Sequence, residues 1–152
     1  MIAADTSTWI AYLEGAPCPD TQLLDQALSD HRLLMIPLVF TELLSDPLLS
    51  PAVLQQLMDV PMIDVEPGYW QRAGLLRAKV LSNRRRARLG DALIAQTCVD
   101  RNIPLLTRDQ DFRAFADAAQ LNLVLCIPSR DRMSTCIHHI CYGNFHSTFP
   151  ES

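Results

Sequence analysis

The stretch from Gly90 to Phe112, GDALIAQTCVDRNIPLLTRDQDF, decides the fold of this chain. Its centre, Ile103 to Leu106, carries no charge, as expected of a buried strand in a parallel sheet. Asp91 begins a helical segment on one side of this strand, and Asp109 and Asp111 precede another helical segment on its other side. Ligands of open α/β sheets bind at the edge where strands end and helices begin. The stretch therefore predicts an acidic site at that edge.

Length and composition favour one ordinary globular domain. The chain has 152 residues, enough for a sizeable core, and 49% of them are hydrophobic and 20% charged. The net charge of −4 argues against a domain that binds nucleic acid through a generally basic surface. It leaves open an enzyme that handles phosphate groups through a bound metal ion.

The cysteines and the N-terminus indicate a cellular compartment. Five cysteines are scattered, and Cys98 and Cys126 lie in apolar segments, as expected of buried thiols in a reducing compartment. The N-terminus lacks a basic region followed by a long apolar run, so we expect no signal peptide and no membrane span. A cytoplasmic location is the default expectation.

Apolar runs alternate with helical patterns along the chain. The expected strands are 1–4, 33–37, 62–65, 103–106 and 121–127. The expected helices are 9–14, 20–31, 38–45, 51–58, 67–83, 92–101 and a last one that ends near residue 119. This alternation indicates an α/β fold with a mostly parallel sheet and right-handed crossovers.

Two acids of the first half of the chain have an ambiguous role. Asp5 directly follows the first strand, where a carboxylate is costly unless it is paired or binds a cation. It either accepts hydrogen bonds from the next helix, which a neighbouring hydroxyl is expected to cap, or it binds a cation. Glu42 is the only charge in an apolar helical segment. It lies either on a solvated face or at an inward site.

The acids of the second half carry the same ambiguity. Asp91, Asp109 and Asp111 stand near expected helix starts, where a carboxylate serves as a cap or interacts with the helix dipole. In a parallel sheet, however, they reach the same edge as the two earlier acids. Converging carboxylates repel one another and need a cation to stay ionised together. Oxygen ligands suit Mg²⁺ or Mn²⁺, and two such ions about 4 Å apart clamp the reacting oxygens of a phosphodiester.

One basic cluster ends the expected helix 67–83 and consists of Arg84, Arg85, Arg86 and Arg88. Cations at a helix C-terminus favour the helix dipole, and this structural interpretation is the better supported. The alternative is contact with a nucleic-acid backbone, because the cluster directly precedes the Gly90–Asp91 corner.

The chain changes character after Pro128. The tail SRDRMSTCIHHICYGNFHSTFPES, residues 129–152, shows no periodicity, and we predict that it is a flexible or loosely packed appendage on a domain that spans 1–128. Its cysteines and histidines are zinc-ligand types. The spacing C-x-H-H-x-C is unusual for structural zinc, so this alternative is weak. The candidate ligands are Cys136, His138, His139, Cys141 and His146.

Four segments together resemble the PIN domain, and more narrowly the VapC toxins of bacterial toxin–antitoxin pairs. They are Asp5-Thr6-Ser7, Thr41-Glu42-Leu43-Leu44, GDALIA from Gly90, and LTRDQDF from Leu106. The resemblance spans Met1 to about Pro128. It implies a three-layer α/β/α sandwich with a mostly parallel central sheet, and an endoribonuclease that depends on Mg²⁺ or Mn²⁺.

The resemblance also implies roles for single residues. The acidic quartet of catalytic and metal-binding residues would be Asp5, Glu42, Asp91 and Asp109, with Asp111 at a variable fifth place. Thr107 and Ser7 would support this cluster, and Arg108 joins the arginine cluster as a candidate RNA contact. Hydrolysis by metal-activated water would leave 5′-phosphate and 3′-hydroxyl ends.

The partners implied by the resemblance are an RNA substrate, a cognate antitoxin and a second copy of the chain, with no membrane. The apolar segments 38–44 and 48–58 are candidate antitoxin or dimer surfaces, unless they are simply core. A PIN-like protein that binds RNA or a partner without cleaving is the main alternative, and the intact acidic set argues against it.

Two other α/β families with acids at strand ends fit less well. A receiver domain needs a lysine after a late strand, and the only lysine, Lys79, lies in an expected helix. A haloacid dehalogenase-type phosphatase needs a second acid two residues after the first, where this chain has Ser7. The histidines, at position 31 and in the tail, disfavour a histidine-based ribonuclease.

Overall fold

A parallel sheet forms the centre of the protein. The computed structural model describes residues 1–127, and its four strands are all parallel in the order β2-β1-β3-β4. The strands are β1 (Ile2–Ala4), β2 (Leu33–Leu34), β3 (Leu105–Thr107) and β4 (Leu123–Leu125). The parallel α/β prediction is confirmed. The expected strand 62–65 is reduced to a single bridge between Met35 and Met62.

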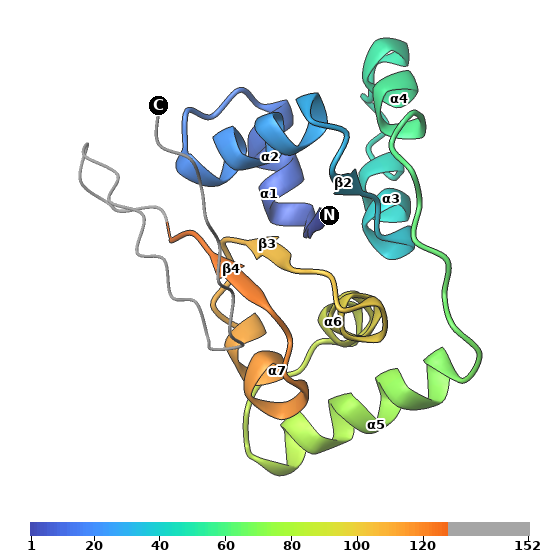
Figure 1. Cartoon of the computed structure of the whole chain (residues 1–152), viewed down its shortest axis with the longest axis vertical. Helices are drawn as coiled ribbons and strands as arrows, with labels where there is room; N and C mark the ends of the chain where they lie inside the picture. Colours follow the sequence, from blue (N-terminus) through green and yellow to red (C-terminus); the bar gives the residue numbers. More distant parts are fainter. Residues whose placement is uncertain (128–152) are drawn as a thin grey trace.

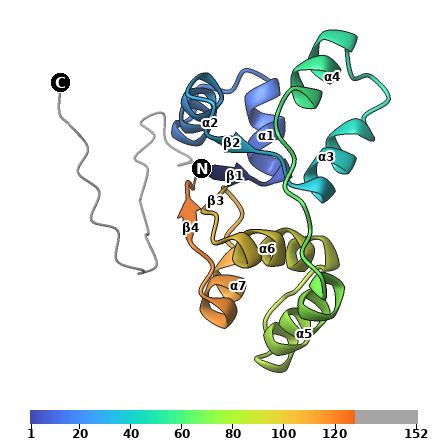
Figure 2. The ribbon, with the colours of Figure 1, turned by 45° about the vertical axis from the view of Figure 1, so that its right-hand side comes forward.

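Seven helices within residues 1–127 cover this sheet. They are α1 (Thr6–Leu13), α2 (Pro19–Ser29), α3 (Pro37–Leu44), α4 (Pro51–Met58), α5 (Tyr69–Ser82), α6 (Leu89–Arg101) and α7 (Phe112–Ala119). Figure 1 shows α1 and α2 on one side of the sheet, α6 and α7 on the other, and α5 packed outside these two. The expected three-layer α/β/α sandwich is therefore present, with α3 and α4 beside it (Figure 2).

Burial on both faces explains the uncharged central strand. Leu105 and Leu106 of β3 are both fully buried, because successive strand residues point to opposite faces and helices cover each face. Trp9 of α1 and Phe115 of α7 are also fully buried. Burying one such side chain stabilises the fold by roughly 2 kcal/mol.

The starts of three helices bear on the role of the acids. Helix α1 begins at Thr6, because Asp5 itself is the cap, so the expectation of a hydroxyl cap was wrong. Helix α6 begins at Leu89, which places Asp91 in the first turn and not at the cap. Asp111 occupies the cap position of α7 but makes no side-chain capping bond. Capping therefore accounts for only one of these acids.

No helix within residues 1–127 is long and apolar enough to cross a membrane. Residues 128–152 lie outside the described part of the chain. The predictions of a domain boundary at 128, of a loosely packed tail and of the weak zinc alternative all fall on those residues.

Candidate active site

The end of β1 carries a buried carboxylate held by hydroxyls. Asp5 is 4% exposed, and its Oδ1 accepts the backbone N–H of Thr8 at 3.1 Å. Its Oδ2 accepts the hydroxyls of Ser7 at 2.8 Å and of Thr107 at 2.7 Å. Burial raises the pKa of Asp5, and these hydrogen bonds oppose the rise. A carboxylate has about four acceptor sites, so these three bonds leave one on Oδ1 for a cation.

Thr107 connects the two halves of the acidic cluster. It is fully buried at the end of β3, and its hydroxyl donates to Asp5 while accepting the backbone N–H of Asp109 at 3.0 Å. The Oδ1 of Asp109 in turn accepts the backbone N–H of Asp111 at 2.9 Å. This chain of bonds sets the path of the loop after β3, so that two further carboxylates lie near Asp5.

On the proposal made below that these acids bind a divalent ion, Thr107→Val is expected to weaken Mn²⁺ binding by about 10- to 100-fold, as loss of a supporting contact does in metal sites. Valine keeps the shape of threonine but removes the hydroxyl that positions Asp5 and the Asp109 loop. Titration calorimetry with Mn²⁺ measures the change. Thr97→Val is the matched control, because the Thr97 hydroxyl is also buried but bonds to Leu93 and Tyr69 away from the acids. Equal metal affinity in both variants would contradict this role.

Helix α6 brings in a fourth carboxylate, whose ionised form is disfavoured by its surroundings. Asp91 lies half-buried in the first turn. Burial, together with the negative charges of Asp109, Asp111 and Asp5, raises its pKa to about 6, against the opposing charge of Arg88. The charges of these three carboxylates act on Asp91 because they lie close to it. The structure therefore brings these four acids to one edge of the sheet.

Glu42 reaches the same edge from α3. Its side chain is exposed, and its Oε2 accepts the hydroxyl of Thr6 in the first turn of α1. Its Oε1 lies 3.9 Å from the point where a Cβ on Gly90 would stand. Glu42 therefore faces both the start of α1 and the start of α6, where Asp91 is located.

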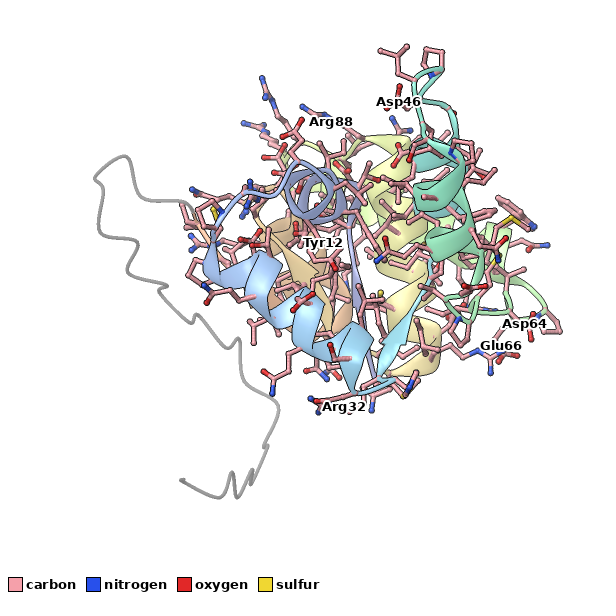
Figure 3. The ribbon with its side chains drawn as sticks, turned by 90° about the horizontal axis from the view of Figure 1, so that it is seen from above. Tyr12, Arg32, Asp46, Asp64, Glu66 and Arg88 are labelled. Carbon is pink, nitrogen blue, oxygen red and sulfur yellow. The ribbon has the colours of Figure 1, made fainter. Side chains whose placement is uncertain are left out.

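The candidate RNA-binding arginines have different surroundings. Arg88 is exposed next to the acids, and Figure 3 shows it at the same edge as Asp46 and opposite Arg32. Arg84 and Arg86 are exposed too, and Arg85 lies 3.9 Å from Asp117. Arg108, the last of these candidates, makes a two-point ion pair with the buried Asp20, at 2.8 and 2.9 Å.

The comparisons with known proteins agree with this arrangement. The family model described as the PIN domain matches residues 2–118. This chain belongs to the PIN domain family. It is 25% identical to Ribonuclease VapC5 of Mycobacterium tuberculosis over 126 residues, which cover 79% of this chain and 91% of the relative.

Solved structures support the PIN fold. The toxin–antitoxin structure VapBC-5 from Mycobacterium tuberculosis matches with a TM-score of 0.58 and 22% identity, covering 82% of this chain and 97% of that one. VapBC2 from Rickettsia felis, bound to a DNA fragment from its promoter, matches with a TM-score of 0.61 and 19% identity, covering 81% and 97%. The resemblance found in the sequence is thus confirmed for family and fold.

The oxygen donors of this PIN domain suit a divalent ion. The raised pKa of Asp91 is what a cation placed among these carboxylates would reverse. Within residues 1–127, no three Asp, Glu, His or Cys side chains already stand as a formed metal cage. To bind a cation, the side chains of the neighbouring acids would have to turn toward it. The carboxylate of Asp5 would stay in place, because hydrogen bonds hold it.

A groove with an apolar floor opens beside Glu42 of the PIN domain. It has a volume of about 450 Å³ and lies between α1, α3 and the segment that leads into α4. Ile10, Leu13 and Leu48 line it, and the carboxylates of Glu14, Glu42 and Asp46 belong to its wall. This surface includes parts of both apolar segments, 38–44 and 48–58, that the sequence marked as candidate partner surfaces.

Sequence reasoning missed two contacts that shape this site. Thr6 holds Glu42, and Asp20 holds Arg108 beside the Asp109 loop. Neither pair has a sequence signal, since the partners are 36 and 88 residues apart. Only the packing of α1 against α3, and of the start of α2 near the end of β3, brings them together.

Proposed function

We propose that this PIN domain is an endoribonuclease that depends on Mg²⁺ or Mn²⁺ and serves as the toxin of a toxin–antitoxin pair. One observation carries the proposal. Carboxylates from separate parts of the chain meet at one sheet edge, and burial, together with the charges of Asp109, Asp111 and Asp5, raises the pKa of Asp91 to about 6. A fold keeps such an arrangement at a cost in stability, which a bound cation would offset.

The metal ligands in this proposal are Asp5, Glu42, Asp91 and Asp109, with Asp111 as a possible fifth. When bound, the ion would supply positive charge at the scissile phosphate and lower the pKa of water. Asp5 is held in one orientation by Ser7 and Thr107, so it serves as the fixed point of the site. Asp91 accepts no hydrogen bond within residues 1–127, so its carboxylate is available for a new contact.

Cleavage of RNA by the purified chain tests the proposal. An end-labelled RNA of mixed sequence should be cut with Mn²⁺ or Mg²⁺, remain intact with EDTA, and yield 5′-phosphate and 3′-hydroxyl ends. Titration calorimetry should show binding of Mn²⁺ alone. If neither cleavage nor metal binding occurs with any divalent ion, the alternative of a non-catalytic PIN-like binding protein takes its place.

The exposed arginines between α5 and α6 are proposed to contact the RNA backbone. Arg84, Arg86 and Arg88 are exposed, and Arg88 stands next to the acids. Changing Arg86 and Arg88 together to Gln should weaken RNA binding uniformly across sequences and flatten its dependence on log[salt] by roughly 0.7 per lost phosphate contact. Fluorescence anisotropy with an RNA oligomer in EDTA measures both quantities. Arg32→Gln, at the opposite edge, is the control, and an unchanged salt slope in the double variant would contradict the contact.

The antitoxin partner is proposed to occupy the groove beside Glu42. The groove combines an apolar floor with carboxylates, so it suits an amphipathic segment that carries a basic side chain. The matching structure VapBC-5 is named as a member of a family of toxin–antitoxin systems. Leu48→Glu, at a side chain that is 89% exposed, should prevent binding of the cognate antitoxin without affecting the fold or RNA cleavage. A complex that forms equally well with Leu48→Glu would exclude this groove.

A further inference from the structure

A buried ion pair holds the one cationic side chain that stands among the acids in the sequence. Arg108 is the only lysine or arginine in the four segments that carry the motif acids. Its neighbours along the chain are Thr107, whose hydroxyl binds Asp5, and Asp109. The guanidinium of Arg108 is nevertheless bound to Asp20, which is not part of the acidic cluster.

The contact between Arg108 and Asp20 uses both oxygens of the carboxylate. Nε of Arg108 donates to Oδ2 of Asp20 at 2.8 Å, and a terminal nitrogen donates to Oδ1 at 2.9 Å. Two parallel hydrogen bonds of this kind make a strong and directional ion pair. Asp20 is 1% exposed in the first turn of α2, and a carboxylate buried this deeply needs a charged partner. The pair therefore ties the positive charge of Arg108 to α2, which contributes none of the clustered acids.

The backbone on either side of Arg108 is held without its side chain. The carbonyl of Thr107 accepts the N–H of Cys126 at 2.9 Å, and its hydroxyl accepts the N–H of Asp109 at 3.0 Å. Asp109 in turn accepts the N–H of Asp111 at 2.9 Å. These bonds place the acids of the loop. The ion pair with Asp20 instead determines where the guanidinium charge lies.

A guanidinium released from Asp20 would compete for the acids. Carboxylates that crowd together favour any cation that comes within reach, and Arg108 is joined to Asp109 by a single peptide bond. Arginine binds carboxylate oxygens in pairs, so it would occupy oxygens that a divalent ion requires. Arg88 is different, because its side chain is exposed and solvent screens its charge.

We propose that Asp20 is a positioning residue of the acidic site, which holds the guanidinium of Arg108 away from the clustered carboxylates and so leaves them free to bind a divalent ion. The inference rests on the proposed function, because it concerns acids that bind such an ion. Asp20 acts only through Arg108 and touches neither the ion nor the RNA.

Three variants test this role by their affinity for Mn²⁺ alone. Asp20→Asn should weaken Mn²⁺ binding about tenfold, because asparagine lacks the charge that holds Arg108. Arg108→Gln should bind Mn²⁺ as tightly as the wild type, and Asp20→Asn combined with Arg108→Gln should regain wild-type affinity. Titration calorimetry on the full chain measures all of these affinities. Every variant lacks the same buried ion pair, so a merely structural role predicts weaker binding in all three.

Asp30→Asn is the matched control for the change in net charge. It removes one negative charge from the exposed pair of Asp30 and Arg32, and Figure 3 shows Arg32 opposite Arg88. Mn²⁺ affinity should be unchanged in this variant. Circular dichroism checks that every variant folds.

Salt and a lysine substitution give two further measurements. The difference in Mn²⁺ affinity between Asp20→Asn and the wild type should shrink as KCl is added, because salt screens the released guanidinium. Arg108→Lys keeps the charge but loses the two-point contact with Asp20, so it should bind Mn²⁺ more weakly than Arg108→Gln does. This comparison decides the matter even if Asp20→Asn fails to fold.

A crystal structure of metal-free Asp20→Asn separates this inference from the proposed function. The guanidinium of Arg108 should lie within about 4 Å of a carboxylate oxygen of Asp5, Asp91 or Asp109. If the wild type binds no Mn²⁺, the metal-dependent function fails, and the position of the guanidinium still decides whether Asp20 keeps it from the acids. A guanidinium that stays beside position 20 or turns to solvent would overturn the inference. So would an equal loss of Mn²⁺ affinity in Asp20→Asn and in the double variant.

Discussion

Asp91→Asn is expected to slow RNA cleavage by at least about 100-fold while making the metal-free protein more stable above pH 6. The two effects have one cause. Burial and the charges of Asp109, Asp111 and Asp5 raise the pKa of Asp91 from 3.8 to about 6, so the ionised form of this side chain is unfavourable in the fold. Asparagine has nearly the same shape but carries no charge.

The sign of the stability effect follows from linkage. A carboxyl group whose folded-state pKa is raised binds its proton more tightly in the folded chain, so its stabilising contribution is complete below about pH 4 and is lost as the pH rises through 6. At pH 8 the ionised Asp91 therefore destabilises the metal-free fold. Because the side chain is only half-buried, solvent screens part of the effect, and we expect a gain of about 1 kcal/mol from Asp91→Asn. At pH 4 the gain should disappear.

Loss of cleavage should be large in the same variant. Removal of one preorganised charged group from an active site costs about 100- to 1,000-fold in rate. Asp91→Asn should also lose the rise in Tm that Mn²⁺ gives the wild type, because an ion that binds only the folded state stabilises it. An Asp91→Asn protein that is more stable than the wild type but inactive would show that Asp91 serves catalysis and not stability.

Asp100→Asn is the matched control on the same helix. Burial raises the pKa of Asp100, but hydrogen bonds from Arg72 and Gln96 outweigh burial and hold the pKa below its usual value. The ionised carboxylate therefore stabilises the fold above its unfolded pKa, and that contribution is lost as the pH falls through the lowered folded pKa. Asp100→Asn should lower Tm at pH 8 and keep RNA cleavage. If Asp91→Asn also lowers Tm, the inference that the ionised Asp91 destabilises the metal-free fold is wrong.

Asp20→Ala is expected to destabilise the protein by about 3 kcal/mol, because Asp20 and Arg108 form the most buried ion pair within residues 1–127. The Asp20 side chain is 2% exposed and that of Arg108 is 21% exposed, so the substitution leaves a largely buried guanidinium without its partner. Urea denaturation at pH 7 measures the loss as a lower midpoint at unchanged slope.

The exposed pair of Asp30 and Arg32 provides the comparison. Its distance of 3.0 Å is close to the 2.8 Å of Asp20 and Arg108, but its side chains are 46% and 53% exposed. Solvated ion pairs of this kind contribute little, so Asp30→Ala should cost less than about 0.5 kcal/mol. If Asp20→Ala and Asp30→Ala lower the free energy of unfolding equally, burial does not determine how much an ion pair contributes to stability. Replacing both Asp20 and Arg108 with apolar residues should recover part of the stability that is lost in Asp20→Ala.

Much of the fold was predictable because local patterns and tertiary packing agree. The bounds of α4, from Pro51 to Met58, are the expected ones, since proline at the first turn and the apolar spacing both act locally. The uncharged run before Thr107 became β3, as expected of a strand that helices cover on both faces. The segment 62–65 failed as a strand because a single residue, Met62, finds a partner on the sheet edge.

The sequence alone determined the family, the parallel sheet and the list of acids, because helices, buried strands and residue types depend on neighbours along the chain. It left the role of each acid open between cap and ligand. The tertiary structure decided that Asp5 both caps α1 and is held by Thr107, 102 residues away. It also placed Asp91 within the field of three other carboxylates and paired Arg108 with Asp20. Electrostatic repulsion and hydrogen bonding depend on distance in space, and only the packed sheet and helices set that distance.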